Sequence, residues 1–464
     1  KTRSLSQIQS SLEIKDSDSA AQLVSVAASA INIQPVQVII NNCTNDCSGH
    51  GTCFISTCTC TKGWVLEDCS ITQEELDSRQ QFRQTLVTAL YSSFNQTVST
   101  GTPVTDDEVN RAAAILSQVT EKPKELNTQT QTTAVSFINT MLSSGVPKIS
   151  ENSAALITQT ISNVLTSSAV EVKTSTPAST EAAKEVSNAI TSVIATTTSL
   201  VLQSKLPGEA PVQIQQPSLA LSLSRQFNTD LANLQVNIPS SANNAKVVLP
   251  SNIAASAQLQ GVVDVQAVNY FVNPYAWSPQ SNNVSSSVLS FNLLSTASTR
   301  KLRVKNLSKP IIFTIPGTFT QFPLQTSKND CLIEPTFIPT CRFWDTTTEQ
   351  WRTDGCEQVS ITSTAIVCAC NHLTDFASLI EFAIPEMNLL TPSDLLLITQ
   401  LNQDNMAIAI ICGALILLYF ALFLFVSFLD YKLQNAKLET LQDIENAKIH
   451  SGRIRSLIEI LKNM

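Results

Sequence analysis

Apolar residues recur every three to four positions through much of the first two hundred residues, a spacing that predicts amphipathic helices. A short helix is expected over residues 16–33, where Asp and Ser residues of the kind that cap helices precede the apolar positions. Across residues 72–203, five apolar stripes alternate with polar turns, and one begins with the capping sequence Thr105-Asp106-Asp107. We therefore predict a helical bundle over residues 71–204.

The pattern changes at Lys205–Ser218, where three prolines and a glycine interrupt the helical spacing. Short apolar runs then alternate with Asn, Pro and Ser, as is typical of antiparallel strands. We predict a β-sandwich over residues 205–385, which makes the fold class multidomain α+β. The runs are KVVLPS, QGVVDVQAVNYFV, SSSVLSFNLL, KPIIFTIPG and TAIVCAC.

Residues 406–429, MAIAIICGALILLYFALFLFVSFL, contain no charged residue and are long enough to cross a hydrocarbon core of about 30 Å as one helix. No Lys or Arg occurs over residues 375–405, whereas six basic residues follow the span. The positive-inside bias therefore predicts a single-pass protein of the plasma or ciliary membrane with its N-terminus outside. Because the chain begins at Lys1 without a signal peptide, this topology requires an upstream segment.

Two segments flank the predicted span. Residues 386–405 are expected to form a stalk with a short helix that starts at Ser393, and residues 430–464 to form a charged cytoplasmic helix. Because acidic residues balance basic ones in the cytoplasmic helix, its apolar face is expected to pack against a partner helix rather than a membrane surface. That face consists of Ile454, Leu457, Ile458 and Leu461.

The composition excludes several functional classes. The formal net charge is −8 and no basic cluster occurs in the first 400 residues, so no nucleic-acid partner is expected. Only three histidines occur, and no set of side chains predicts catalysis on an external substrate, a metal site or a cofactor. The partners that we expect are the membrane and an extracellular protein or matrix ligand.

Eleven of the twelve cysteines precede the span, as expected in an oxidising compartment. Six of them fall within CTNDCSGHGTCFISTCTCTKGWVLEDC, a segment too small to bury a core without cross-links. A zinc site is the competing interpretation, but the even number and the extracellular side favour three disulfides. The spacing resembles an EGF-like module over residues 41–70, after an N-terminal helical segment over residues 1–40. The resemblance implies the pairs Cys43–Cys53, Cys47–Cys58 and Cys60–Cys69.

Four Asn-x-Ser/Thr sequons also lie on the predicted extracellular side, which makes their asparagines candidate glycosylation sites. They are Asn42, Asn95, Asn283 and Asn306.

The most specific signal is the ordered set C-x2-W-x6-W-x4-C-x11-C-x-C-x-H-L-T-x-F, which begins at Cys341. The set resembles the GPS motif, over residues 341–382, of the GAIN domain found in adhesion-type receptors and large polycystins. The resemblance extends to the preceding bundle and sandwich, and it implies the disulfides Cys341–Cys368 and Cys356–Cys370. We expect Trp344 and Trp351 to pack beside these bridges. Cys331 is left over, as a free thiol or a bridge to another chain.

The chemistry follows from the tripeptide His372-Leu373-Thr374. A Thr hydroxyl is a poor nucleophile, and a neutral imidazole is the side chain best suited to take its proton near pH 7. In a strand, residues two apart point to one face with side chains about 6 to 7 Å apart, so a bent backbone must bring base and nucleophile together. The hydroxyl would attack the Leu373 carbonyl, and water would hydrolyse the resulting ester between Leu373 and Thr374.

Every cysteine before the membrane also precedes this bond, so no disulfide within the chain would join the two fragments there. They would be held together by the strand that begins at Thr374. In the receptor family that strand can act as a tethered agonist of a seven-helix bundle, and Phe376 and Leu379 match its usual apolar anchors.

The leading hypothesis is an adhesion or mechanosensory receptor-like protein that cleaves itself and no other molecule. The alternatives are a non-cleaving structural anchor of an extracellular assembly and the front end of a multi-span, polycystin-like channel receptor. A partner chain would bind through Cys331 or the cytoplasmic helix.

Overall fold

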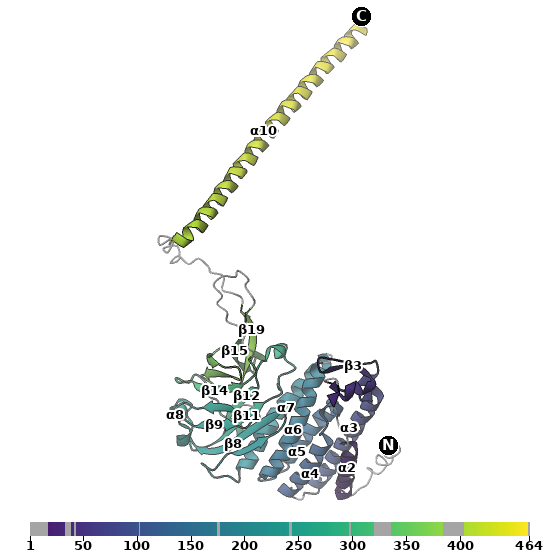
Figure 1. Ribbon diagram of the computed structural model, residues 1–464, viewed down its shortest axis with the longest axis vertical. Coiled ribbons are helices and arrows are strands. Elements are labelled where there is room, and N and C mark those ends of the chain that lie inside the picture. Colours follow the sequence, from purple (N-terminus) through teal and green to yellow (C-terminus); the bar gives the residue numbers. More distant parts are fainter. Residues whose placement is uncertain are drawn as a thin grey trace. The chain divides into compact units, whose positions relative to one another are not determined.

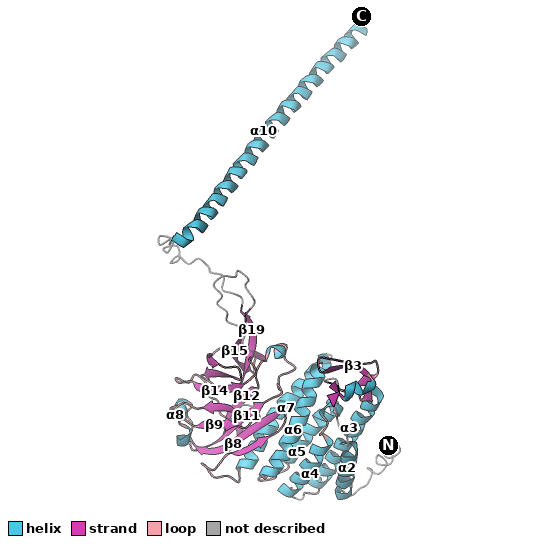
Figure 2. Cartoon of the chain, viewed as in Figure 1, coloured by secondary structure: helices cyan, strands magenta, loops and turns pink. Residues whose placement is uncertain are grey.

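The computed structural model describes residues 17–32, 39–40, 43–101, 103–173, 177–240, 244–296, 298–319, 336–383 and 403–462. The chain divides into two compact units, Lys1–Ile384 and Pro385–Met464. In the first unit, the long helices lie together and the strands of the two large sheets lie together beside them, as Figure 2 shows.

Six long helices form a bundle in the first unit (Figure 1). Five of them lie in the region where five were predicted, because each buries one apolar stripe in a common core. Thr105 begins one helix with a capping box, in which its hydroxyl and the Glu108 carboxylate satisfy each other's backbone N–H groups. The helices are α2 (Ser17–Asn32), α3 (Gln73–Ser99), α4 (Asp106–Val119), α5 (Thr128–Ser143), α6 (Glu151–Lys173) and α7 (Pro177–Leu202).

Helix α2 packs against α3 and α4, so the helix of the predicted separate segment 1–40 belongs to the bundle. Arg83 joins the three helices, because its guanidinium donates to Asn32 Oδ1 of α2 at 2.9 Å and to the Val119 carbonyl of α4 at 2.6 Å. The same guanidinium forms a buried ion pair with Glu125 at 2.6 Å. The chain therefore leaves the bundle after α2 and returns to it at α3.

The cysteine-rich segment lies between these two helices. Its disulfides are Cys43–Cys53, Cys47–Cys58 and Cys60–Cys69, the pairs that the EGF resemblance implies. The three cysteines at its centre, Cys43, Cys47 and Cys58, are all consumed by these bonds rather than left as metal ligands. Its strands are β1 (Ile39–Ile40), β2 (Cys43–Thr44), β3 (Gly51–Phe54), β4 (Thr57–Cys60), β5 (Trp64–Val65) and β6 (Ile71–Thr72).

Two antiparallel sheets pack face to face in the second half of the first unit, around a core that includes Phe291, Phe313 and Phe376. The smaller sheet has the order β17-β18-β14-β10-β9, and the larger one β16-β15-β19-β12-β11-β8-β7, with β13 beside β12. The strands are β7 (Val212–Gln215), β8 (Leu219–Phe227), β9 (Gln235–Ile238), β10 (Ala245–Val248), β11 (Val262–Tyr270), β12 (Val288–Ser295), β13 (Ser298–Lys301), β14 (Ile311–Pro316), β15 (Thr336–Asp345), β16 (Gln350–Arg352), β17 (Cys356–Ile361), β18 (Ala365–Cys370) and β19 (Asp375–Ala383).

Helices α6 and α7 cover the outer face of the larger sheet. Leu219, Leu221 and Leu223 of β8 point toward the helices and share their core. Gln266 of β11 donates to Thr198 Oγ1 of α7 at 2.7 Å and to the Ile194 carbonyl at 3.3 Å, so this buried amide is hydrogen-bonded to the helix. The outer face of the larger sheet is therefore covered by helices and is not exposed to solvent.

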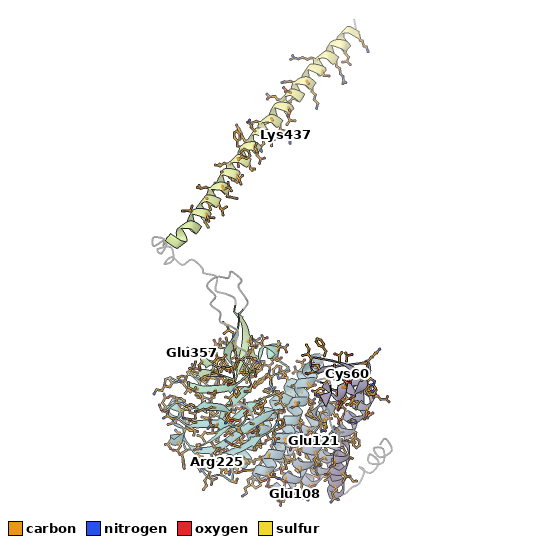
Figure 3. All side chains as sticks on the ribbon, in the orientation of Figure 1. Cys60, Glu108, Glu121, Arg225, Glu357 and Lys437 are labelled. Carbon is orange, nitrogen blue, oxygen red and sulfur yellow. A yellow bond between two sulfur atoms is a disulfide. The ribbon has the colours of Figure 1, made fainter. Side chains whose placement is uncertain are left out.

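The second unit contains α10 (Gln403–Lys462), one continuous helix that includes the predicted span 406–429 (Figure 3, near Lys437). Residues Ile410–Arg453 contain an apolar stretch long enough to cross a membrane. Most of the predicted stalk, including the helix expected at Ser393, lies outside the described residues. The predicted cytoplasmic residues continue the same helix, and the side chains of its expected apolar face are not described.

Candidate functional site

The tripeptide His372-Leu373-Thr374 lies in a bend between β18 and β19. The premise that it forms a strand is therefore wrong, and the backbone is bent at this position. The chain turns here because Cys370 ends a strand of the smaller sheet and Asp375 begins a strand of the larger one. The bend thus crosses from one layer of the sandwich to the other.

Two disulfides hold the strands that lead into the bend. Cys341–Cys368 joins β15 in one sheet to β18 in the other, and Cys356–Cys370 joins neighbouring strands of the smaller sheet. These are the pairs that the motif implies. The expectation that Trp344 and Trp351 pack beside them is wrong, because alternation along β15 turns Cys341 into the sandwich and Trp344 to the opposite face.

Backbone hydrogen bonds hold the bend at Asn371 and Leu373. The Asn371 N–H donates to the Gly355 carbonyl at 2.9 Å, and the Asn371 carbonyl accepts from Leu307 N–H at 2.9 Å. The Leu373 N–H donates to the Val304 carbonyl at 3.2 Å. The loop after β13 and the turn before β17 therefore position the proposed scissile bond.

The His372 ring is half-buried between aromatic side chains. Its centroid lies 4.4 Å from that of Phe343, in an edge-to-face arrangement, and 5.7 Å from that of Phe376. Nδ1 lies 3.1 Å from Asn371 Oδ1, and Nε2 is buried without a hydrogen-bond partner. Burial lowers the pKa of His372, the positive charge of Lys305 lowers it further, and Asp354 partly opposes both effects. The ring is therefore neutral at pH 7.

The hydroxyl of Thr374 donates to the Trp344 carbonyl at 2.9 Å. No hydrogen bond joins Thr374 to His372 in the described part of the chain. The candidate nucleophile and base thus flank the Leu373 peptide group without contacting each other by a hydrogen bond. Each is held by another group, the base by Asn371 and the nucleophile by Trp344.

Asp375, next to the candidate nucleophile, is buried and was not identified from the sequence. Its carboxylate accepts a hydrogen bond from the Tyr275 hydroxyl, in the loop between β11 and β12. Burial and the carboxylate raise the pKa of Tyr275 well above its ordinary value, so the hydroxyl keeps its proton. Tyr275 stacks on Trp344 at 4.1 Å and meets Trp351 edge to face at 5.6 Å. The sequence feature that could have pointed to this loop is the closeness of Tyr275 and Trp277 in NPYAWSP.

The strand β19 lies in the interior of the larger sheet, between β15 and β12. Phe376 points into the sandwich and stacks on Phe313 at 4.1 Å, while Leu379 points to the opposite face. Ser378 N–H donates to Ser286 Oγ at 2.7 Å, so the loop before β12 also binds this strand. The two predicted anchors are therefore both buried, but in different cores.

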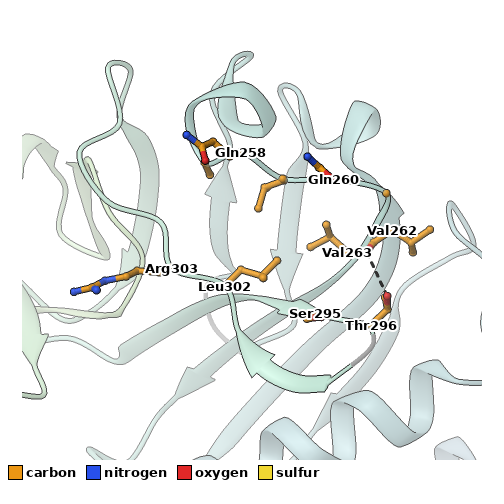
Figure 4. A pocket seen from close by; sticks show the side chains of 11 residues that line it. Gln258, Gln260, Val262, Val263, Ser295, Thr296, Leu302 and Arg303 are labelled. Atoms are coloured by element: carbon orange, nitrogen blue, oxygen red, sulfur yellow. Dashed lines mark hydrogen bonds between the residues drawn. The ribbon is translucent and has the colours of Figure 1, made fainter.

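The remaining predicted positions do not gather at this site. Asn95, Asn283 and Asn306 are exposed, as glycosylation requires, whereas Asn42 and Cys331 lie outside the described residues. A surface cavity of about 390 Å³ lies between the start of β11 and the segment around Arg303 (Figure 4). Its lining includes Gln258, Thr296 and Leu302, and none of the tripeptide.

Residues 212–383 match the family model described as GPS: GAIN subdomain B. The chain is 26% identical to adhesion G-protein coupled receptor G2 of Rattus norvegicus over 208 residues, which are 40% of the chain and 19% of that protein. It is 30% identical to adhesion G protein-coupled receptor G3 of Mus musculus over 199 residues, 43% of the chain and 31% of the relative. Adhesion G protein-coupled receptor L4 of Danio rerio is 31% identical over 125 residues, 25% of the chain and 17% of that protein. The chain thus spans less than a third of each of these relatives.

Proposed function

We propose that this chain, a GAIN and GPS membrane protein whose residues 212–383 form a GAIN subdomain B, cleaves its own backbone between Leu373 and Thr374. The observation that carries the proposal is the buried, unpartnered Nε2 of a neutral His372 one residue away from the scissile bond. A buried nitrogen with an unused lone pair is available to accept a proton.

The proposed reaction needs no group from outside the chain except water. Thr374 Oγ attacks the Leu373 carbonyl carbon and His372 Nε2 takes the hydroxyl proton, which gives a tetrahedral intermediate. The bond between the Leu373 carbon and the Thr374 nitrogen then breaks as the imidazolium returns its proton to that nitrogen. Water hydrolyses the resulting ester to a Leu373 carboxylate and the free Thr374 hydroxyl.

The hydrogen bond from Thr374 to Trp344 must be released before the attack. A neutral hydrogen bond contributes about 1 kcal/mol net, which is less than a tenfold effect on a rate. This hydrogen bond by itself therefore slows the reaction only slightly.

The role that we propose for the whole chain is that of an adhesion-receptor-like protein of the plasma membrane, with residues 1–405 outside the cell. The proposed partners are an extracellular protein or matrix ligand and a chain that contacts the cytoplasmic helix or Cys331. After cleavage, the fragment that begins at Thr374 would be retained by the pairing of β19 with β15 and β12. Its separation would be the signal.

A second candidate function is a structural anchor that never cleaves. The bond from Thr374 to Trp344, with no direct bond to His372, favours this alternative. The experiment that separates the two is denaturing, non-reducing electrophoresis of the full chain, the Thr374→Ala variant and the matched control Thr353→Ala, which removes an exposed hydroxyl. We expect a fragment with Thr374 at its N-terminus from the wild type and the control only. An intact wild-type chain would exclude the proposed cleavage and favour the anchor.

A further inference from the structure

Asn371, which precedes the tripeptide, contacts the His372 ring. Gly355, in the turn before β17, contacts Asn371 in turn. We propose that Asn371 is a positioning residue which, with Gly355 behind it, selects the His372 tautomer that leaves Nε2 free to accept the Thr374 proton. The inference rests on the proposed self-cleavage and names the groups that would orient its base.

The hydrogen-bond partners of the ring select one tautomer. An amide oxygen only accepts hydrogen bonds, so the contact of 3.1 Å between Asn371 Oδ1 and His372 Nδ1 requires the proton on Nδ1. In the neutral ring the lone pair then lies on Nε2, which is the buried nitrogen without a partner. When Nε2 gains a proton, Nδ1–H keeps the same acceptor, and the amide dipole stabilises the imidazolium. The same role belongs to the third member of a Cys-His-Asn triad.

Gly355 fixes the amide in this position. Its φ of +77° lies in the left-handed region, and its carbonyl accepts from the Asn371 N–H at 2.9 Å. A Cβ at Gly355 would overlap Asn371 Oδ1 and would lie 3.0 Å from Asn371 Cγ. The turn before β17 thus leaves room for the Asn371 side chain only because residue 355 has none.

The charged groups that act on the ring are few. Lys305 comes from the loop after β13, and Asp354, paired with Arg352, comes from the turn before β17. Phe343 and Phe376, which cover the ring, do not titrate. A carboxylate introduced at position 371 would therefore be the nearest charge to the imidazole, and it would favour the charged ring.

The test measures the rate of self-cleavage of the full chain. The chain is pulse-labelled during translation into microsomes, and aliquots are then transferred to detergent buffers from pH 5 to pH 8.5. Asn371→Ala removes the acceptor and is expected to slow cleavage by about tenfold or more, a fraction of the general-base contribution of roughly 10²–10⁴. Asn371→Asp keeps an acceptor for Nδ1–H, so cleavage should recover at high pH. Its acid limb should move to higher pH than that of the wild type, because the carboxylate stabilises the imidazolium.

Gly355→Ala is the second arm, because it displaces the amide while leaving Asn371 and His372 in the sequence. Gly208→Ala is the matched control, since Gly208 also has a positive φ, of +86°, but nothing lies within 4 Å of its added Cβ. Both substitutions incur the same kind of backbone strain, and only Gly355→Ala is expected to slow cleavage. Thermal unfolding of both variants shows whether they fold equally well.

The outcomes separate the two proposals. If the wild type stays whole and matches Thr374→Ala, the proposed cleavage and the role of Asn371 both fall. A second outcome is that the wild type cleaves, Asn371→Ala cleaves at the wild-type rate and Asn371→Asp has the wild-type pH profile. In that case only the role of Asn371 is overturned. A slower Asn371→Ala with a shifted acid limb in Asn371→Asp supports both, because a merely structural role would not move the pH profile.

Discussion

At the scale of the residue, the environment of His372 makes cleavage dependent on pH. Its pKa is lowered from the ordinary value of about 6.5 by burial and by Lys305, so the neutral, basic form predominates above that value. The cleavage rate should therefore be flat from about pH 7 to pH 8 and should fall only below about 6.5. A midpoint above pH 7 in the translation assay would contradict this prediction.

The exposed Lys305 offers a sharper version of the same prediction. Removal of its charge in Lys305→Ala should raise the His372 pKa and move the acid limb of the cleavage profile to higher pH. Because Lys305 is exposed, the shift should shrink in about 1 M salt, where the Debye length is about 3 Å. The matched control is Lys301→Ala, an exposed lysine that has no effect on this ring. Equal profiles for both variants would exclude a role for Lys305.

At the scale of the element, β19 is held to the rest of the sandwich by a buried polar contact as well as by its ladder. Tyr275→Phe removes the donor to Asp375 and leaves a buried carboxylate without a partner, which should cost about 1–3 kcal/mol. After cleavage the same contact would join the two fragments, so the variant should release the fragment 374–464 at lower urea concentration. The control is Tyr91→Phe, whose hydroxyl pairs only with Thr140. Equal release from both variants would argue against this contact.

The bundle has a corresponding buried contact at Arg83. Arg83→Met removes one of the two arginine partners of Glu125 and the link to Asn32. Arg79 still pairs with the carboxylate at 2.8 Å, so the cost should stay below the roughly 3–5 kcal/mol of an uncompensated buried charge. We expect a lower melting temperature by circular dichroism and faster proteolysis of the segment that contains α2. Arg303→Met, at an exposed position, should leave both measurements unchanged.

At the scale of the whole molecule, anchoring depends on the apolar part of α10. Phe420→Arg places a charge near the middle of the predicted span and should reduce insertion by about 2.5–3.5 kcal/mol. Leu441→Arg makes the same kind of change on the same helix beyond the span and should be neutral. Extraction of microsomes with alkaline carbonate compares the two. Retention of both variants in the pellet would be inconsistent with residues 406–429 as the span.

Much of the architecture was predictable because its signals lie within contiguous segments. Apolar stripes predicted five helices where α3 to α7 lie, and alternating runs predicted five strands that correspond to β10, β11, β12, β14 and β18. Strands β15, β16 and β17 of the GPS motif, and β8, were not among the runs predicted from their pattern. Residues such as Ser222 and Ser224 of β8 are buried, so the alternation of polar and apolar positions there does not mark a solvent face.

Local spacing was enough to predict the long helices of the bundle, five of the strands, the apolar span and the ordered motif that contains His372 and Thr374. The contacts that these residues make follow from the tertiary structure alone. Tyr275 and Asp375 are 100 residues apart, and Asn32 reaches Arg83 across the inserted cysteine-rich module. The bend at Leu373 also arises from the crossing between two sheets. Contacts between distant segments depend on how whole layers of helices and strands pack, and local periodicity does not predict that packing.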